Sequence, residues 1–92
     1  MSEKRSKLQI FMDILFVIQG ENGKAKPTHI LYGANLSHSS LKEYLNMLLS
    51  NGFVKEVKEN KHNLYALTKK GYEFINESRK IKRLTEAFGI PM

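Results

Sequence analysis

The sequence predicts a small, mainly α-helical domain that carries one β-hairpin. Three observations support this fold class. Residues 27–52 have the pattern of two short helices joined by a tight turn, and residues 53–67 alternate apolar and polar side chains around a charged middle. Residues 7–19 and 69–88 repeat apolar side chains at helical spacing. The predicted order is therefore helix, helix, helix, hairpin, helix, in a single domain that spans residues 1–92.

The length and net charge of the chain limit the kinds of molecule that it is expected to bind. Ninety-two residues make one domain with a small core, so association with a second copy would add stability. Fifteen Lys and Arg residues against nine Asp and Glu residues give a net charge of +6, which favours polyanions. The sequence has no cysteine, which excludes disulfides, thiolate metal sites and a cysteine nucleophile.

The apolar run at residues 8–18 follows Lys4, Arg5 and Lys7, as the apolar region of a signal peptide follows its basic region. Asp13 interrupts the run, no small-residue cleavage site follows, and the run is too short to span a bilayer. We therefore expect a core helix in a cytoplasmic protein that has no membrane partner.

The first helix is predicted over residues 6–19 and stops at Gly20. It carries two apolar stripes, so we expect it to be covered on more than one side. The first stripe contains Leu8, Phe11, Met12, Leu15 and Ile18, and the second contains Ile10, Ile14 and Val17. Residues 21–26 are predicted to form a loop.

The second helix is predicted over residues 28–33, with Pro27 in its first turn and Tyr32 part-buried between helices. Asn35 and Leu36 make the turn. Ser37 is the expected N-cap of the third helix, and a capping box of Ser40 with Glu43 is the alternative start. The third helix ends at Asn51-Gly52 and buries Leu41, Tyr44, Leu45, Leu48 and Leu49.

Residues 53–57 and 63–67 are predicted to pair as a hairpin whose loop, residues 58–62, is longer than the two-residue type. Thr68 caps a last helix over residues 69–88, which ends at Gly89, and Gly71 weakens its first turn. A helix-turn-helix followed at once by a hairpin is a winged helix, in which the hairpin is the wing. The winged-helix core is predicted at residues 7–67, and the C-terminal helix at residues 68–88.

Several short motifs give this chain a specific resemblance. They are Arg5-Ser6-Lys7-Leu8, Thr28, Ile30, the run Tyr32-Gly33-Ala34-Asn35-Leu36-Ser37, the pair Tyr44-Leu45, Gly52, and Tyr65-x-Leu67-Thr68-x-Lys70-Gly71. Together they resemble the small archaeal winged-helix DNA-binding proteins that were first grouped with chromatin proteins. The Y-G-A-N-L-S run is the distinctive part, whereas the L-T-x-K-G start of the last helix is common to many winged helices.

The resemblance implies a homodimer in which the long C-terminal helices pair as an antiparallel coiled coil. The apolar residues expected at this interface are Phe74, Ile81, Leu84 and Phe88, and Glu77 occupies an earlier position of the same pattern. Two heptads are short for a lone pair. This row of apolar residues, the seam of the last helix, would be stabilised by packing against the second stripe of the first helix. The packing could occur within the subunit or across the dimer, and we favour the dimer.

Three groups of residues are candidates for contact with double-stranded DNA. The third helix is the expected recognition helix, and its outer face carries His38, Ser39, Ser40, Lys42, Glu43 and Asn46. The start of the second helix carries Lys26, Thr28 and His29, and the wing carries Lys58, Asn60, Lys61 and His62. The alternative interpretation is that the serines only cap the helix and that the charged residues only solvate it. The basic run at residues 79–83 either extends the DNA surface or flanks the coiled coil.

The main hypothesis is a homodimeric transcriptional regulator that is nucleoid-associated in the cytoplasm. One alternative is an architectural or chromatin protein of low sequence specificity, since no arginine lies on the recognition face. Another is a winged-helix module that binds protein, since Glu43 lies on the recognition face and Glu56 and Glu59 lie in the wing. The three histidines lack metal-ligand spacing and no phosphate loop is present, so we expect no enzyme, cofactor, metal or small-molecule substrate.

Overall fold

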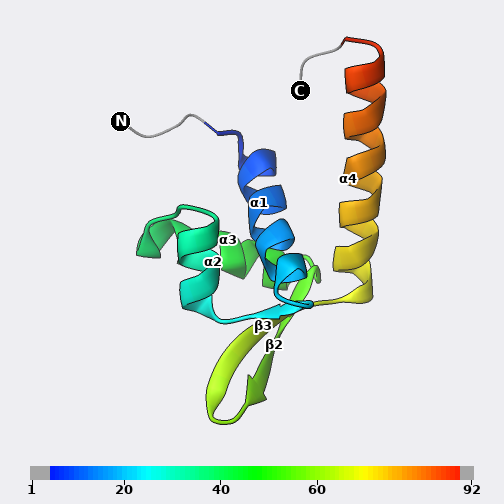
Figure 1. The fold of residues 1–92 in the computed structure, drawn as a ribbon. Helices are drawn as coiled ribbons and strands as arrows, with labels where there is room; N and C mark the ends of the chain where they lie inside the picture. The colour runs from blue at the N-terminus through cyan, green and yellow to red at the C-terminus, as the bar shows by residue number, and fades with distance from the viewer. Residues whose placement is uncertain (1–4, 90–92) are drawn as a thin grey trace.

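The computed structural model describes residues 5–89, and it has the predicted order of helices with the hairpin before the last helix (Figure 1). The fold class is therefore confirmed as a mainly helical winged helix. The elements are α1 (Lys7–Gly20), β1 (Lys24–Ala25), α2 (Pro27–Gly33), α3 (His38–Ser50), β2 (Val54–Glu59), β3 (His62–Leu67) and α4 (Lys69–Ala87).

Three of the four helices begin behind a hydroxyl side chain that accepts a backbone N–H bond. Ser6 caps α1, Ser37 caps α3 and Thr68 caps α4, in each case by accepting from the amide three residues later. The start of α3 after Ser37 is thus confirmed, and the alternative start after Ser40 is wrong. Ser40 instead supplies the amide that Ser37 binds, at 3.1 Å.

The wing belongs to a sheet of three antiparallel strands in the order β1-β3-β2. The prediction that residues 21–26 form only a loop is wrong, because Lys24 pairs with Ala66 and Ala25 pairs with Tyr65. A strand of two residues is too short to show an alternating pattern, so its sequence carries no signal of pairing. Its effect is to bind the segment before α2 to the base of the wing.

The turn of the wing has two residues. Glu59 pairs with His62, which leaves Asn60 and Lys61 between the strands with φ angles of +50° and +66°. These values are typical of a type I′ turn. The predicted longer loop is therefore wrong, because the turn has lysine where its usual second residue is glycine, and this hides the signal.

The core forms where α1 meets the other helices and the sheet. α1 contacts both α2 and α4, which explains why it is apolar on two sides (Figure 1). The largest fully buried side chains come from four helices and are Ile14, Leu15, Ile18, Ile30, Leu48 and Ile75.

Gly71 is needed at the start of α4 because the chain crosses closely there. A Cβ atom at this position would lie 2.2 Å from the carbonyl oxygen of Phe53. Thr68 contacts the same segment, since its hydroxyl donates to the carbonyl oxygens of Gly52 and Phe53. The helix propensity that glycine gives up is thus offset by close packing of α4 on the loop before β2.

Candidate nucleic-acid interface

Four residues of the Y-G-A-N-L-S run have a clear physical role in the turn between α2 and α3. A Cβ atom at Gly33 would lie 2.9 Å from Cγ2 of Val17, so glycine lets α2 approach α1 closely. Asn35 adopts φ +55°, a left-handed conformation that asparagine tolerates. The Leu36 amide then donates to the Leu31 carbonyl at 3.0 Å, and Ser37 caps α3.

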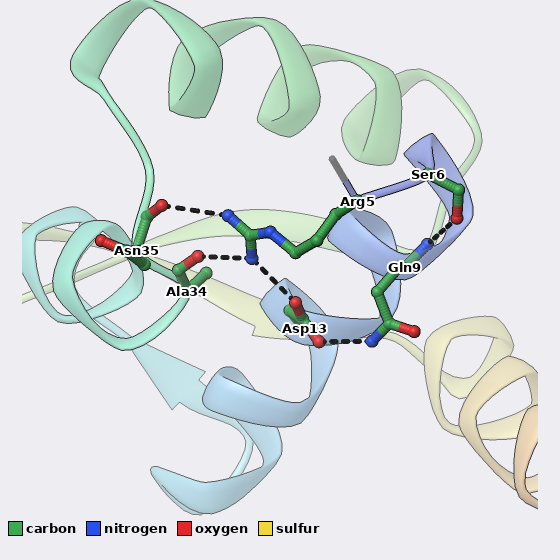
Figure 2. A network of polar contacts seen from close by, with 6 residues as sticks. All are labelled: Arg5, Ser6, Gln9, Asp13, Ala34 and Asn35. Carbon is green, nitrogen blue, oxygen red and sulfur yellow. Dashed lines mark hydrogen bonds and ion pairs between the residues drawn. The ribbon is translucent and has the colours of Figure 1, made fainter. Parts of the chain in front are cut away.

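A polar network links Arg5, which lies two residues before α1, to this turn (Figure 2). Arg5 Nη1 donates to Asp13 Oδ2 at 2.8 Å and to the Ala34 carbonyl at 2.9 Å. Arg5 Nη2 donates to the Asn35 carbonyl at 3.0 Å. Sequence reasoning assigned Arg5 no such contact, because its partners on the turn lie 29 and 30 residues away along the chain.

The outer face of α3 matches the predicted recognition surface in its exposure. His38, Ser39, Lys42, Glu43 and Asn46 are exposed, and Ser40 is half-buried. The opposite face enters the core through Leu41, Tyr44, Leu45 and Leu48. α3 therefore presents one polar face over more than two turns.

A shallow hollow of about 170 Å³ brings part of this face together with two other elements. His38, Lys42 and Asn46 line it from α3, together with Pro27 at the start of α2 and Tyr65 on β3. Tyr65 was not among the predicted site residues. Burial raises the pKa of its hydroxyl, and the neighbouring Glu56 carboxylate raises this pKa further. The Tyr65 hydroxyl is also hydrogen-bonded to this carboxylate, so Tyr65 lies beside α3 with its donor already engaged.

The predicted residues at the start of α2 are exposed, but one of them already has an acidic neighbour. Lys26, Thr28 and His29 all reach solvent. His29 Nδ1 lies 3.4 Å from Glu21 Oε1, so this carboxylate competes with any anion near His29. Tyr32, which we expected to be part-buried, is 79% exposed. The prediction was wrong because α2 has only seven residues and buries Ile30 and Leu31 on the opposite side.

The wing extends away from the helices (Figure 1), and lysines lie at its tip. Lys58, Asn60, Lys61 and His62 are all exposed there. Glu59, which dilutes the charge of the wing in the sequence, forms an ion pair with Lys24 on β1. This pair balances the charge of Glu59 and leaves the lysines of the tip as its main charged groups.

The predicted dimer residues divide into one that is half-buried and three that are more than half exposed. Phe74 is half-buried, and its ring centroid lies 4.9 Å from that of Phe53. Ile81, Leu84 and Phe88 are 55%, 58% and 74% exposed. A hollow of about 120 Å³ between α1 and α4 is lined by Leu8, Met12, Phe74, Glu77, Ser78 and Ile81.

Leu8 and Met12 belong to the first apolar stripe of α1. Within the subunit, the seam of α4 therefore shares this hollow with the first stripe, whereas the sequence indicated the second. Packing of the second stripe across a dimer stays a prediction. Val17 of the second stripe packs beside Gly33 of α2 instead.

None of the helices between residues 5 and 89 combines the length and apolar character needed to cross a membrane. Over the same residues, His, Asp and Glu side chains do not gather in threes as metal ligands would.

A turn-linked helix pair, a polar recognition face and an adjoining hairpin define a winged helix-turn-helix module. Residues 4–86 match the family model described as winged helix-turn-helix, and the chain belongs to this family. The family and the fold are those of such a module and not of an enzyme.

Two uncharacterized proteins of Methanocaldococcus jannaschii are similar in sequence. The first is 39% identical over 74 residues, which cover 80% of this chain and 73% of the relative. The second is 32% identical over 83 residues, which cover 90% of this chain but only 36% of the relative. The chain therefore spans about a third of the second relative's length.

Solved structures of winged-helix proteins share the fold. Sso10a-2, a DNA-binding protein from Sulfolobus solfataricus, is 25% identical with a TM-score of 0.77, over 91% of this chain and 85% of that one. F93 from STIV, a winged-helix DNA-binding protein, has a TM-score of 0.73 at 15% identity, over 87% and 92% of the two chains. A MarR family transcriptional regulator from Silicibacter pomeroyi has a TM-score of 0.74 at 17% identity, over 87% of this chain and 56% of that one. The resemblance to small archaeal winged-helix proteins is confirmed.

Proposed function

We propose that this chain binds double-stranded DNA as a homodimer and regulates transcription by occupying its sites. The observation that carries the proposal is the exposed polar face of α3, which shares one hollow with the start of α2 and with β3. Membership of the winged helix-turn-helix family and the likeness to a DNA-binding protein of Sulfolobus solfataricus support it. The net charge of +6 supplies the electrostatic attraction that any DNA-binding protein requires.

In this proposal, α3 enters the major groove and the other elements contact the backbone. Asn46 can pair with adenine, and Lys42 can pair with guanine or a phosphate. Ser39 and Ser40 contact base edges or phosphates, while Lys58 and Lys61 on the wing contact phosphates or the minor groove. DNA binding of this kind implies a nucleoid-associated location in the cytoplasm.

The homodimer forms in this proposal through the second half of α4. Ile81, Leu84 and Phe88 lie on one helical seam and are each more than half exposed. A second copy that covers this seam would hold two recognition helices at a fixed separation. Sites with two half-sites at matching spacing would then bind most tightly.

One observation favours a second function on the same surface. α3 carries no arginine, which is the commonest bidentate reader of guanine. An architectural protein with little sequence preference therefore stands as the alternative within DNA binding. A module that binds protein is the alternative from another class, and Glu43 on the recognition face favours it.

Binding of a random duplex of roughly 30 base pairs, measured by fluorescence anisotropy across a salt series, tests the proposal. We expect a log–log slope of about −4 or steeper, because each neutralised phosphate contributes about 0.9. The absence of binding at low salt would remove the architectural alternative and leave either a strictly site-specific regulator or a protein-binding module.

The double variant Lys42→Ala/Asn46→Ala separates the three functions. A regulator loses its preference among sites, an architectural protein weakens evenly on all duplexes, and a protein-binding module shows no change with DNA. The matched control is Lys69→Ala/Asn76→Ala, which removes the same two side-chain types from exposed positions on α4.

A further inference from the structure

The polar network around Arg5 joins the two motifs that the recognition surface does not explain. One is Arg5-Ser6 before α1, and the other is the turn Ala34-Asn35 between α2 and α3. Asn35 is followed after two residues by His38, the first residue of α3. Any group that holds this turn therefore also holds the start of the recognition helix.

The guanidinium is well placed to hold the turn. It donates to two consecutive carbonyl oxygens, at 2.9 Å and 3.0 Å, where the C-terminal end of α2 concentrates negative partial charge. The Arg5 side chain is 19% exposed, so these charge-assisted bonds are partly shielded from water. Its planar fork reaches three acceptors at once, which the point charge of a lysine does not reproduce.

The carboxylate of Asp13 fixes the guanidinium in turn (Figure 2). Its Oδ2 accepts from Arg5 at 2.8 Å, and its Oδ1 accepts from Gln9 Nε2 at 2.8 Å. The Gln9 amide donates to Ser6, the N-cap of α1. Each member of the chain of bonds is thus held by the next, from the first turn of α1 to the turn before α3.

We propose that Arg5, oriented by Asp13, is a positioning residue that sets the angle of α3 against α1 and so determines how well the recognition face fits DNA. The inference rests on the proposed function, because fit to DNA is its outcome. A recognition surface needs its supporting contacts to hold side chains within a fraction of an ångström of their productive places. Loss of the network lowers DNA affinity through the turn, because the bonds of Arg5 reach Asp13, Ala34 and Asn35.

Three single variants test this on the random duplex of roughly 30 base pairs, at a temperature where circular dichroism shows each to be folded. Arg5→Gln and its control Lys7→Gln remove the same charge from neighbouring positions, and Lys7 is exposed at the start of α1. We expect Arg5→Gln to bind roughly threefold to tenfold more weakly than Lys7→Gln. Arg5→Lys keeps the charge and should recover only part of the loss.

Asp13→Asn is the most discriminating variant, because its effect on charge and its effect on the position of α3 change DNA affinity in opposite directions. It raises the net charge from +6 to +7, so electrostatics alone predicts tighter binding. Positioning predicts weaker binding, with an unchanged salt slope because the same phosphates are contacted. Equal affinities for Arg5→Gln and Lys7→Gln, or tighter binding by Asp13→Asn, would overturn the inference while leaving DNA binding intact.

Amide hydrogen exchange measures, without DNA, how strongly the network stabilises the turn before α3. We expect Arg5→Gln, and not Lys7→Gln, to speed exchange at residues 36–41, where the turn leads into α3. If the wild-type protein binds no random duplex at low salt, general DNA binding fails separately, and only a strictly site-specific regulator or a protein-binding module remains. Unchanged exchange in Arg5→Gln would then reject the positioning role as well.

Discussion

The two halves of α4 belong to the same helix but have different surroundings. The first half buries Gly71, Ile75 and Ser78 against its own domain. The second half leaves Ile81 and Leu84 more than half exposed. Helical structure without tertiary packing is marginal in water, so the second half draws little stability from the chain that forms it. The domain therefore packs mainly against the first half, and the exposed second half supports our proposal that it pairs with a second copy.

The largest effect is expected from a cavity in the first half. Ile75→Ala should lower the free energy of unfolding by about 3 kcal/mol, because Ile75 is 1% exposed and packs in the core. Ile81→Ala, the same type of truncation in the second half, should change it by less than about 0.5 kcal/mol. Urea unfolding at low protein concentration measures both values. Similar losses of unfolding free energy for the two variants would contradict the difference between the two halves of α4.

Close packing at the start of the first half gives the second prediction. Gly71→Ala should destabilise the fold by about 2 kcal/mol, because the new Cβ atom would collide with the Phe53 carbonyl. Gly20→Ala is the control, since a Cβ atom at Gly20 has no neighbour within 4 Å. The control should be neutral or slightly stabilising. Thermal unfolding followed by circular dichroism compares the two.

The third prediction concerns association through the second half. Leu84→Glu should raise the dimer dissociation constant by about tenfold or more, because it inserts a charge into the apolar seam. Asn76→Glu adds the same charge on an exposed position of the first half and should have little effect. Sedimentation equilibrium measures both. A wild-type protein that sediments only as a 10.6 kDa species at all concentrations would contradict the dimer.

The smallest loss of unfolding free energy is expected at Arg79, where the packed first half of α4 meets the exposed second half. Arg79 donates to Gln19 at 2.9 Å and lies over the ring of Phe16, 5.6 Å from its centroid. Arg79→Gln should cost about 0.5 kcal/mol of unfolding free energy, because both contacts are exposed. Arg83→Gln, one turn further along, should cost less. Equal costs in urea unfolding would move the boundary toward the C-terminus.

Local signals in the sequence predicted most of the fold. The hydroxyl caps Ser37 and Thr68 and the apolar spacing of α1, α3 and α4 each lie within a few residues of the structure that they specify. The failures have different causes. β1 is too short to show a pattern, and the turn of the wing has Lys61 where glycine is usual. The exposure of Tyr32 depends on which face of α2 meets α1, which a helix of seven residues does not reveal.

The sequence predicted only part of the candidate site, because some of its residues are brought there by contacts that are distant in sequence. The amphipathic pattern of α3 predicted which side chains are exposed, because burial within one helix follows its period. Tyr65 and Arg5 reach the site through tertiary contacts with residues distant in sequence. Both residues belong to the motifs that gave the family resemblance, but those motifs do not show where the side chains lie in space. Contacts of this kind become visible only once the elements are assembled.

The left-handed backbone of Lys61 has a consequence for the reach of the molecule. A residue other than glycine or asparagine costs on the order of 1 kcal/mol in that conformation. Glycine there would relax the turn but would delete an ammonium group from the end of a hairpin with six residues in each strand. Such strands extend about 20 Å. The chain gives up local stability to carry positive charge at the tip of the wing, and this widens the area over which its electric field acts.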